Sequence, residues 1–247
     1  MTADPFPFNL IQTEPPRIGL IALQSDETIE TDFRRLIPRE ASLMVSRVPS
    51  APEVSNETLA AMEHHLTASA ALFPEDLPFD SIGYGCTSGS AQIGPDTIAS
   101  RIHAGAKTRS VTEPVTALTH ACQSLGLTRL AFLSPYIAPV SQRLRDVLGD
   151  QGIQTPYFGS FDVAEEAKVA RIDAGSIIDA AVKLVQSTDA EALFLSCTNL
   201  RTLDIIPDLE ARLKRPVLSS NQVLAWHLMT LSTLKATADA PGQLFQS

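Results

Sequence analysis

The sequence predicts an α/β fold in which two parallel-sheet halves, related by internal duplication, enclose one cleft. Short apolar runs of strand length alternate with segments of helix length over residues 17–231, a pattern typical of parallel sheets with helices on both faces. The pattern also restarts: the run RLAFL at Arg129 follows the run RIGLI at Arg17 by 112 residues. Cys86 and Cys197, which each follow an apolar run and precede a threonine, are 111 residues apart. This near-constant offset indicates duplication.

In the first half, an extended arm without periodicity is expected over residues 1–16, which contain four prolines. The run RIGLIAL that begins at Arg17 is apolar throughout, as in parallel strands buried on both faces. Asn56 is a residue type that favours a helix start. Strands are expected at 17–23, 42–48, 80–84 and 108–111, and helices at 28–36, 57–72, 91–103 and 114–125.

The second half repeats this order of elements. Strands are expected at 129–133, 153–158, 193–196 and 217–218, and helices at 140–148, 176–185, 202–213 and 221–231. We assign residues 17–115 together with 221–247 to the first half and residues 116–220 to the second.

The functional cleft is expected beyond the carboxyl ends of the strands, where open parallel sheets bind their ligands. Four loops occupy that position: residues 24–27, residues 134–136, and the loops that contain Cys86 and Cys197. In two halves that face each other, these loops converge. The active site is therefore predicted in the cleft between the halves, with a thiol from each wall.

The position of each cysteine between a strand end and a helix start indicates a reactive thiol. Backbone N–H groups at such a start favour an anion, so the thiol pKa should fall from about 8.5 toward neutrality. The same N–H groups, with the hydroxyls of Thr87, Ser88 and Thr198, could hold a substrate carboxylate. Two thiols on opposite faces of a carbon suit racemisation, and one thiolate that adds to an alkene suits cis–trans isomerisation. Cys86 and Cys197 are thus the candidate catalytic residues.

Composition narrows the classes of partner. The net charge is −9 and basic runs are lacking, which argues against nucleic acid and anionic membranes as partners. Apolar runs fall well short of the roughly 18 residues of a membrane span, and the first 16 residues lack the basic and apolar regions of a secretory signal. A cytoplasmic location is the expectation.

The sequence contains no complete motif for binding a cofactor or a metal. Gly83-Tyr-Gly85 begins like a dinucleotide-binding fingerprint, but the third glycine is not in place. Ser88 lacks the flanking glycines of a serine hydrolase elbow. The five histidines lack metal-ligand spacing, and Cys122 lies in an apolar helical stretch typical of a core position. We expect no cofactor and no metal.

The motif GCTSGS at 85–90, paired with FLSCTNLRT at 194–202, resembles the aspartate/glutamate racemase superfamily. The nearest branch is that of maleate cis–trans isomerases and arylmalonate decarboxylases, with ectoine-utilisation proteins as relatives. This resemblance implies two Rossmann-like halves related by pseudo-twofold symmetry, catalysis by paired cysteines without a cofactor, and a homodimer. Arylmalonate decarboxylases keep only the second cysteine, so the presence of Cys86 argues against plain decarboxylation.

Carried over by position, the resemblance makes Cys86 the nucleophile and Cys197 the proton donor. Tyr136 resembles the tyrosine that contacts the substrate carboxylate, and Asn199 matches the second cysteine motif. The list of candidate substrate-binding residues therefore comprises Asp26, Thr87, Ser88, Tyr136, Glu166, Thr198 and Asn199.

Two of these residues depart from the isomerase pattern. Asp26 and Glu166 stand where the isomerases have asparagines that grip the substrate. Carboxylates there would repel a dicarboxylate and attract an ammonium or amidine group. The alternative is that one or both acids are solvated loop residues.

These observations leave three hypotheses open. The first is a cofactor-independent racemase or isomerase of a small carboxylate, amino-acid-like or ectoine-derived. The second is a maleate cis–trans isomerase, which follows from the overall motif match. The third, from a different class, is a non-catalytic protein that binds a small molecule.

Overall fold

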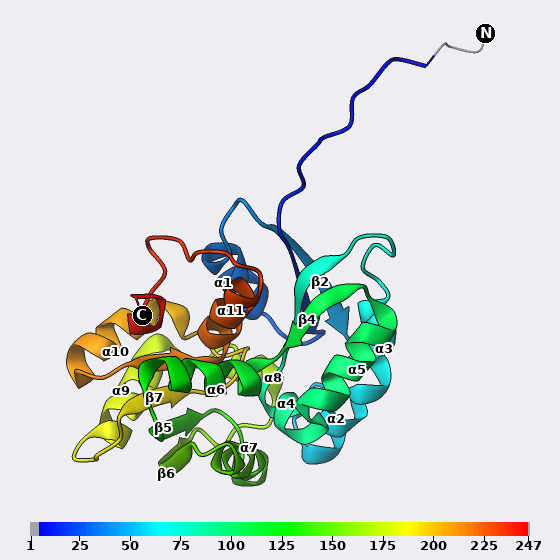
Figure 1. Ribbon diagram of the computed structural model, residues 1–247. Coiled ribbons are helices and arrows are strands. Elements are labelled where there is room, and N and C mark those ends of the chain that lie inside the picture. Colours follow the sequence, from blue (N-terminus) through cyan, green and yellow to red (C-terminus); the bar gives the residue numbers. More distant parts are fainter. Residues whose placement is uncertain (1–4, 247) are drawn as a thin grey trace.

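The computed structural model describes residues 5–246 and contains two four-stranded parallel sheets (Figure 1). The strand orders are β2-β1-β3-β4 and β6-β5-β7-β8, so each strand of the second sheet takes the place of its counterpart in the first. The predicted α/β fold with two equivalent halves is confirmed. The strands are β1 (Arg17–Leu23), β2 (Ser42–Val48), β3 (Phe79–Gly85), β4 (Thr108–Thr112), β5 (Arg129–Ser134), β6 (Gln154–Ser160), β7 (Ala192–Leu195) and β8 (Val217–Ser219).

Helices connect the strands in both halves, as parallel pairing requires. The first half contains α1 (Ile29–Leu36), α2 (Asn56–Ala61), α3 (Glu63–Ala70), α4 (Thr87–Ile93) and α5 (Pro95–Gly105). They are followed by α6 (Pro114–Leu125), α7 (Ala138–Asp150), α8 (Glu166–Val169), α9 (Ala174–Val185), α10 (Ile206–Leu213) and α11 (Ser220–Leu231). Two short 3-10 helices, η1 (Leu203–Ile205) and η2 (Gln243–Gln246), complete the list.

Most predicted elements are present, and the differences have local causes. The helix expected at 91–103 begins four residues earlier, at Thr87, and is broken at Gly94, whose φ of +92° interrupts the helix before Pro95 starts α5. The helix expected at 57–72 is divided into α2 and α3. Ser55, and not Asn56, caps α2 by accepting the N–H of Thr58.

The two halves exchange one helix each. α6 follows β4 of the first sheet, yet Leu118 and Ala121 lie in one core cluster with Phe132 and Phe194 of the second sheet. α11 follows β8 of the second sheet but packs on β3 of the first, where Ser81 donates a hydrogen bond to the carbonyl of Leu228. The division into 17–115 with 221–247 and 116–220 stays a prediction, and this exchange is the packing that supports it.

The N-terminal arm leaves the body of the molecule at the start of β1 (Figure 1). Residues 5–16 form no helix or strand, and Phe6 and Phe8 are 90% and 82% exposed. The first four residues of the predicted arm lie outside the described residues.

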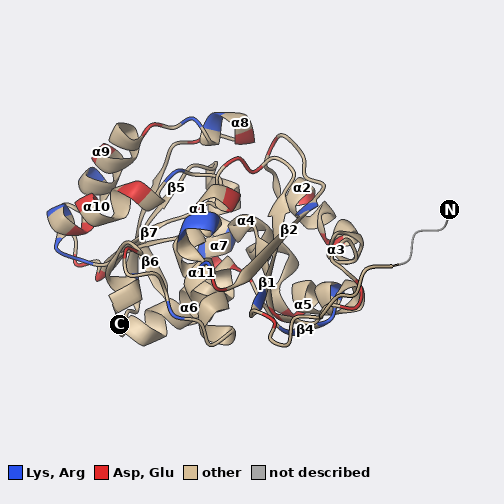
Figure 2. Cartoon of the chain, turned by 90° about the horizontal axis from the view of Figure 1, so that it is seen from above, with Lys and Arg blue, Asp and Glu red and all other residues tan. Residues whose placement is uncertain are grey.

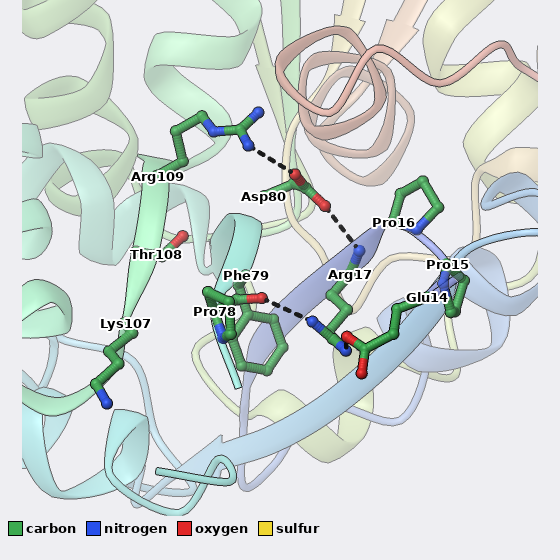
Figure 3. A pocket seen from close by; sticks show the side chains of 10 residues that line it. All are labelled: Glu14, Pro15, Pro16, Arg17, Pro78, Phe79, Asp80, Lys107, Thr108 and Arg109. Atoms are coloured by element: carbon green, nitrogen blue, oxygen red, sulfur yellow. Dashed lines mark hydrogen bonds and ion pairs between the residues drawn. The ribbon is translucent and has the colours of Figure 1, made fainter. Parts of the chain in front are cut away.

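A cavity of about 610 Å³ lies at the base of the arm. Figure 3 shows Asp80 between two arginines: its carboxylate accepts the backbone N–H of Arg17 at 2.9 Å and pairs with Arg109 at 3.4 Å. The cavity is lined by Phe79, the first residue of β3, whereas Cys86 follows the last residue of that strand. A seven-residue strand spans roughly 20 Å. This cavity is therefore at the opposite end of the sheet from the predicted cleft.

Charged residues of both signs are mixed along the helices. Figure 2 shows acidic and basic positions next to each other on α8 and on α10, which carry Glu166 with Lys168 and Asp208 with Arg212. Over residues 5–246, no helix is long and apolar enough to cross a membrane.

Candidate active site

The two cysteine loops contact each other across the boundary between the halves. Cys86 directly follows β3, and Cys197 lies two residues after β7. The hydroxyl of Thr198 donates to the carbonyl of Gly85 at 3.3 Å, which joins the two loops. Both thiols are buried, with 5% and 3% of the residue exposed. The structure thus brings together two cysteines that are 111 positions apart in the chain.

Each thiol is held by a backbone N–H group. The sulfur of Cys86 caps α4 and accepts the N–H of Gly89 at 3.2 Å. An added Cβ at Gly89 would lie 2.9 Å from that sulfur and 2.6 Å from the hydroxyl of Tyr84, so the close approach requires glycine. The sulfur of Cys197 accepts the N–H of Asn199 at 3.3 Å. Both sulfurs therefore have a fixed position before any ligand arrives.

The backbone of Cys197 is strained. Its φ is +111°, a region that residues with a side chain rarely adopt, whereas the φ of Cys86 is −151° and extended. The N–H of Cys197 donates to the hydroxyl of Ser220 at 3.0 Å, which helps to hold this conformation. Such strain costs about 1–3 kcal/mol and is concentrated at functional sites. The geometry of the second thiol is thus maintained at a cost in stability.

The predicted hydroxyl ligands bond mainly to the protein itself. Thr87 donates to Ser220 at 2.7 Å, and Thr198 donates to Gly85. Ser88 is buried, and its side chain makes no hydrogen bond to another residue that the structure describes. The N–H groups of Thr87 and Ser88 are the first two of α4 and have no partner inside the helix. These backbone donors, more than the hydroxyls, are available to a carboxylate.

Asp26 is buried at the start of α1, with 4% of the residue exposed. Its Oδ1 accepts the N–H groups of Thr28 and Ile29 at 2.7 and 2.8 Å. Its Oδ2 is buried and accepts no hydrogen bond from the described residues. Burial raises the pKa of this carboxyl group. Asp26 is therefore not a solvated loop residue, and the nearby hydroxyl of Thr198 offsets part of the rise in its pKa.

Glu166 is also buried, with 3% of the residue exposed, and both of its oxygens are occupied. Oε1 accepts the hydroxyl of Tyr136 at 2.6 Å, and Oε2 accepts the amide of Asn199 at 2.8 Å. The same tyrosine hydroxyl lies 3.0 Å from the sulfur of Cys197. The amide oxygen of Asn199 accepts the N–H of Glu27. Four predicted site residues thus form one hydrogen-bonded chain that ends at a thiol.

Two loops close over this chain, one from each half. Val54 donates its N–H to the carbonyl of Ala164 at 2.9 Å, and Glu166 donates its N–H to the carbonyl of Pro52 at 3.0 Å. Nearby, Arg171 and Glu27 form an exposed ion pair at 2.8 Å. These contacts join a segment of each half beside the buried Glu166.

Comparison with known proteins places the chain in a family. A family model described as arylmalonate decarboxylase matches residues 95–245, which contain Cys197 but begin after Cys86. The chain belongs to this family. The predicted isomerase class is confirmed by relatives of near full length that are maleate isomerases.

The relatives of this chain include maleate isomerases and an arylmalonate decarboxylase. Maleate isomerase from Nocardia farcinica is 25% identical over 242 residues, which is 93% of this chain and 95% of that protein. Arylmalonate decarboxylase from Bordetella bronchiseptica is 31% identical over 118 residues, which is 47% of this chain and only 49% of that protein.

Solved structures of the family share the fold. A maleate isomerase from Pseudomonas putida with maleate has a TM-score of 0.85 at 22% identity, covering 94% of this chain and 98% of that one. A liganded double mutant of arylmalonate decarboxylase has a TM-score of 0.83 at 25% identity, covering 94% of this chain and 100% of that one.

The thiol pKa values differ from the sequence-based expectation. Burial raises the pKa of Cys86 to about 12, and the N–H of Gly89 offsets this only in part. The pKa of Cys197 is raised well above its usual value by burial and then by the negative charges of Glu166 and Asp26. The predicted fall toward neutrality is wrong for this closed site, because loss of solvent outweighs the N–H groups at the strand ends.

Three further residues support the site and were not predicted. Ser220 binds both Thr87 and the N–H of Cys197, and Asn221 donates to Asp32 and to the carbonyl of Thr198 at 2.8 Å each. The strand-end rule, applied to the fourth strand of the second sheet, would have found Ser220 and Asn221. Asp32 lies within α1, where the sequence carries no signal for it. Cys122, predicted as a core residue, is buried among apolar side chains.

The strain at Cys197 predicts an unusual order of stability. Cys197→Gly is expected to be more stable than Cys197→Ala by about 1 kcal/mol, because glycine adopts a positive φ without strain. At Cys86 the order should be reversed by about the same amount, since its backbone is extended and glycine there only adds entropy to the unfolded chain. Urea unfolding of the four variants checks this, and the same order at both positions would contradict it.

The buried carboxyl group of Asp32 predicts a pH-dependent stability. Its pKa is raised from 3.8 to about 6, chiefly by burial, so the folded state holds the proton more tightly than the unfolded state. Its contribution is fully present below about pH 4 and is lost as the pH rises to about 6. Asp32→Asn should therefore gain stability relative to the wild type between these pH values, by up to about 3 kcal/mol.

The measurement for Asp32 is urea unfolding at pH 4 and pH 7. Asp179→Asn, the same change at an exposed position on α9, is the matched control. A difference between Asp32→Asn and the wild type that does not change with pH would count against the assignment.

Proposed function

We propose that this protein is a cofactor-independent isomerase or racemase that acts on a small carboxylate through Cys86 and Cys197. The observation that carries the proposal is the junction of the two cysteine loops, made by the hydrogen bond from Thr198 to Gly85. The pKa values of both thiols are raised in part by the same two carboxyl groups, Glu166 and Asp26, so both thiols lie near these groups. A related maleate isomerase from Nocardia farcinica, studied as a cysteine-to-serine mutant, holds a covalently bound succinylcysteine intermediate.

The chemistry requires two thiols in different protonation states. In racemisation, one thiolate removes the proton from the substrate Cα and the other thiol delivers a proton to the opposite face. In isomerisation, the thiolate of Cys86 adds to the alkene, the resulting single bond rotates, and elimination restores the thiolate. In both reactions negative charge moves onto the substrate carboxylate. The free N–H groups of Thr87 and Ser88 can stabilise it.

The two carboxylates favour a substrate with a positive charge. Asp26 has a buried oxygen without a hydrogen-bond partner among the described residues, and Glu166 adds a second potential charge nearby. A dicarboxylate would add further negative charge to this closed space, whereas an ammonium or amidine group would neutralise it. An amino-acid-like or ectoine-derived carboxylate is therefore the first candidate substrate.

Maleate is the second candidate. Burial raises the pKa of Asp26, and a protonated carboxyl group can donate a hydrogen bond to a substrate carboxylate much as an asparagine amide does. The maleate isomerases among the relatives support this reading. A homodimer and a cytoplasmic location remain predictions of the family resemblance and of the composition.

Solvent exchange and isomerisation together test the proposed reaction. In deuterated water, a racemase is expected to incorporate deuterium at Cα of an amino acid or an ectoine-derived carboxylate. A cis–trans isomerase is expected to convert maleate to its trans isomer, and the addition and elimination steps require no deuterium exchange. Cys86→Ala and Cys197→Ala should each lose at least about 100-fold in rate, because each removes a proton-transfer or covalent step. Proton NMR of a panel of amino acids, ectoine-derived carboxylates and maleate is the measurement.

Cys122→Ala is the matched control, since that thiol lies in the core away from the cleft. It should keep the wild-type rate. Absence of exchange and isomerisation across the panel, together with ligand affinities that neither cysteine variant changes, would favour the non-catalytic binding protein.

Asp26→Asn tests the charge of the substrate. The neutral amide removes the attraction for a cationic group and restores the donor found in maleate isomerases. The variant should gain at least about 10-fold in kcat/KM for maleate and lose at least as much for a cationic substrate. Loss of maleate absorbance near 240 nm and deuterium exchange are the two assays. Asp179→Asn should change neither, and equal changes for both substrates would refute the cation preference.

A further inference from the structure

We propose that Glu166 is the proton partner of Cys197 and that it acts through the hydroxyl group of Tyr136. This inference rests on the proposed function, because it concerns how the second thiol gains and loses its proton. It also gives Glu166 a role other than the substrate binding that its position in the sequence predicts.

The hydrogen bonds fix the direction of the chain. Glu166 as a carboxylate can only accept, so the tyrosine hydroxyl donates to Oε1 over 2.6 Å. The hydrogen of Tyr136 is then used, and its oxygen is left to accept the S–H of Cys197 over 3.0 Å. Asn199 donates to Oε2 over 2.8 Å and to the carbonyl of Glu166 over 3.2 Å, which holds the carboxylate in place. The thiol is thus linked to a buried base by two hydrogen bonds.

The transfer is balanced within the protein. The S–H bond of Cys197 breaks as its proton binds the tyrosine oxygen, and the original tyrosine proton moves to Oε1 of Glu166. The products are a thiolate, an unchanged tyrosine and a neutral carboxylic acid. Tyr136 then donates to the thiolate and accepts from Glu166, so both hydrogen bonds persist in the reverse direction.

This route avoids the main electrostatic cost of a buried thiolate. Release of the proton to water would add a negative charge to a closed space that already holds Asp26 and Glu166, and burial raises the pKa of Cys197 for that reason. Internal transfer leaves the net charge unchanged. Burial also raises the pKa of Glu166, which makes it a stronger proton acceptor than an exposed glutamate.

Cys86 has no equivalent route. Its sulfur accepts from the N–H of Gly89, and the hydroxyl of Tyr84 contacts the sulfur of Met62 at 3.7 Å. Tyr84 also hydrogen-bonds the thiol of Cys86, but among the described residues its hydroxyl contacts the sulfur of Met62 and not a carboxylate. The carboxyl group of Glu113 is connected through Ser90 to the backbone carbonyl of Cys86 and not to its thiol. The two halves have similar backbones, but within the described part of the chain only the thiol of Cys197 is connected by hydrogen bonds to a carboxylate that can exchange a proton with it. This difference suits Cys86 as the nucleophile and Cys197 as the thiol that exchanges protons.

The pH dependence of alkylation at Cys197 distinguishes this relay from a structural role. Below the thiol pKa, a thiolate formed by loss of a proton to water increases about tenfold per pH unit. A thiolate formed by transfer to Glu166 does not depend on pH while the pair holds one proton. The wild type should therefore react with iodoacetamide at a nearly constant rate at Cys197 between about pH 6 and pH 8.

Variants of the relay residues should remove the plateau, which is the nearly constant alkylation rate at Cys197 between about pH 6 and pH 8. Glu166→Gln, which removes the acceptor, and Tyr136→Phe, which breaks the link, should each restore a rise of about tenfold per pH unit. The double variant should behave like Tyr136→Phe alone. Glu165→Gln, the same change at the half-buried neighbouring residue whose carboxylate pairs with Lys168, should keep the plateau. Peptide mass spectrometry resolves Cys197 from Cys86, which reports access to the same closed cleft in every variant.

The outcome does not depend on the substrate. A wild-type rate at Cys197 that rises tenfold per pH unit, or no reaction at pH 6–8, overturns the relay. So does a plateau that survives in Glu166→Gln, or an effect of Glu166→Gln that is equally large in the Tyr136→Phe background. Circular dichroism verifies that each variant is folded. A plateau without any turnover would leave the relay in place and reject the proposed isomerase function instead.

Discussion

The exclusion of water from one small space is the constraint on which the site depends. Two thiols and the carboxyl groups of Asp26 and Glu166 are all nearly inaccessible, and burial raises the pKa of each of the four. Charge in such a space is costly unless an opposite charge or a retained proton matches it. A nucleophilic thiolate must therefore arise by moving a proton within the site or by binding a cationic substrate.

The duplicated fold places the two cysteines at equivalent positions, and the side chains around them differ between the halves. Equal strand orders place the two cysteines at equivalent strand ends, and the exchange of α6 and α11 binds the halves to each other. Tyr136, Glu166 and Asn199 all come from the second half, and their hydrogen-bonded chain ends at its thiol. Asp26, from the first half, caps a helix with one oxygen, and its other oxygen has no close hydrogen-bond partner among the described residues. Duplication therefore gave two thiols whose surroundings differ.

The sequence predicts the strands, the duplication and the pairing of the cysteines, because each depends on local patterns or on their spacing. It does not predict how deeply Asp26 and Glu166 are buried, because burial depends on contacts between segments far apart in the chain, such as the pairing of Glu166 with Pro52. The prediction that the thiol pKa values fall toward neutrality is wrong because it also depends on burial. A strand end next to a helix start is visible in the sequence, but the loops that exclude water from it are not.

Glu166 and Asp26 differ in how many of their carboxylate oxygens have close hydrogen-bond partners. Glu166 has no oxygen left for a ligand, because Tyr136 and Asn199 occupy both, so it suits proton storage. Asp26 has one oxygen with no close hydrogen-bond partner among the described residues, so the proposed function assigns it to substrate binding. An ammonium group would favour ionised Asp26, whereas a carboxylate would favour protonated Asp26. Substrate charge and the protonation of Asp26 are thus coupled. Under the proposed function, this coupling would separate the substrates of this protein from maleate.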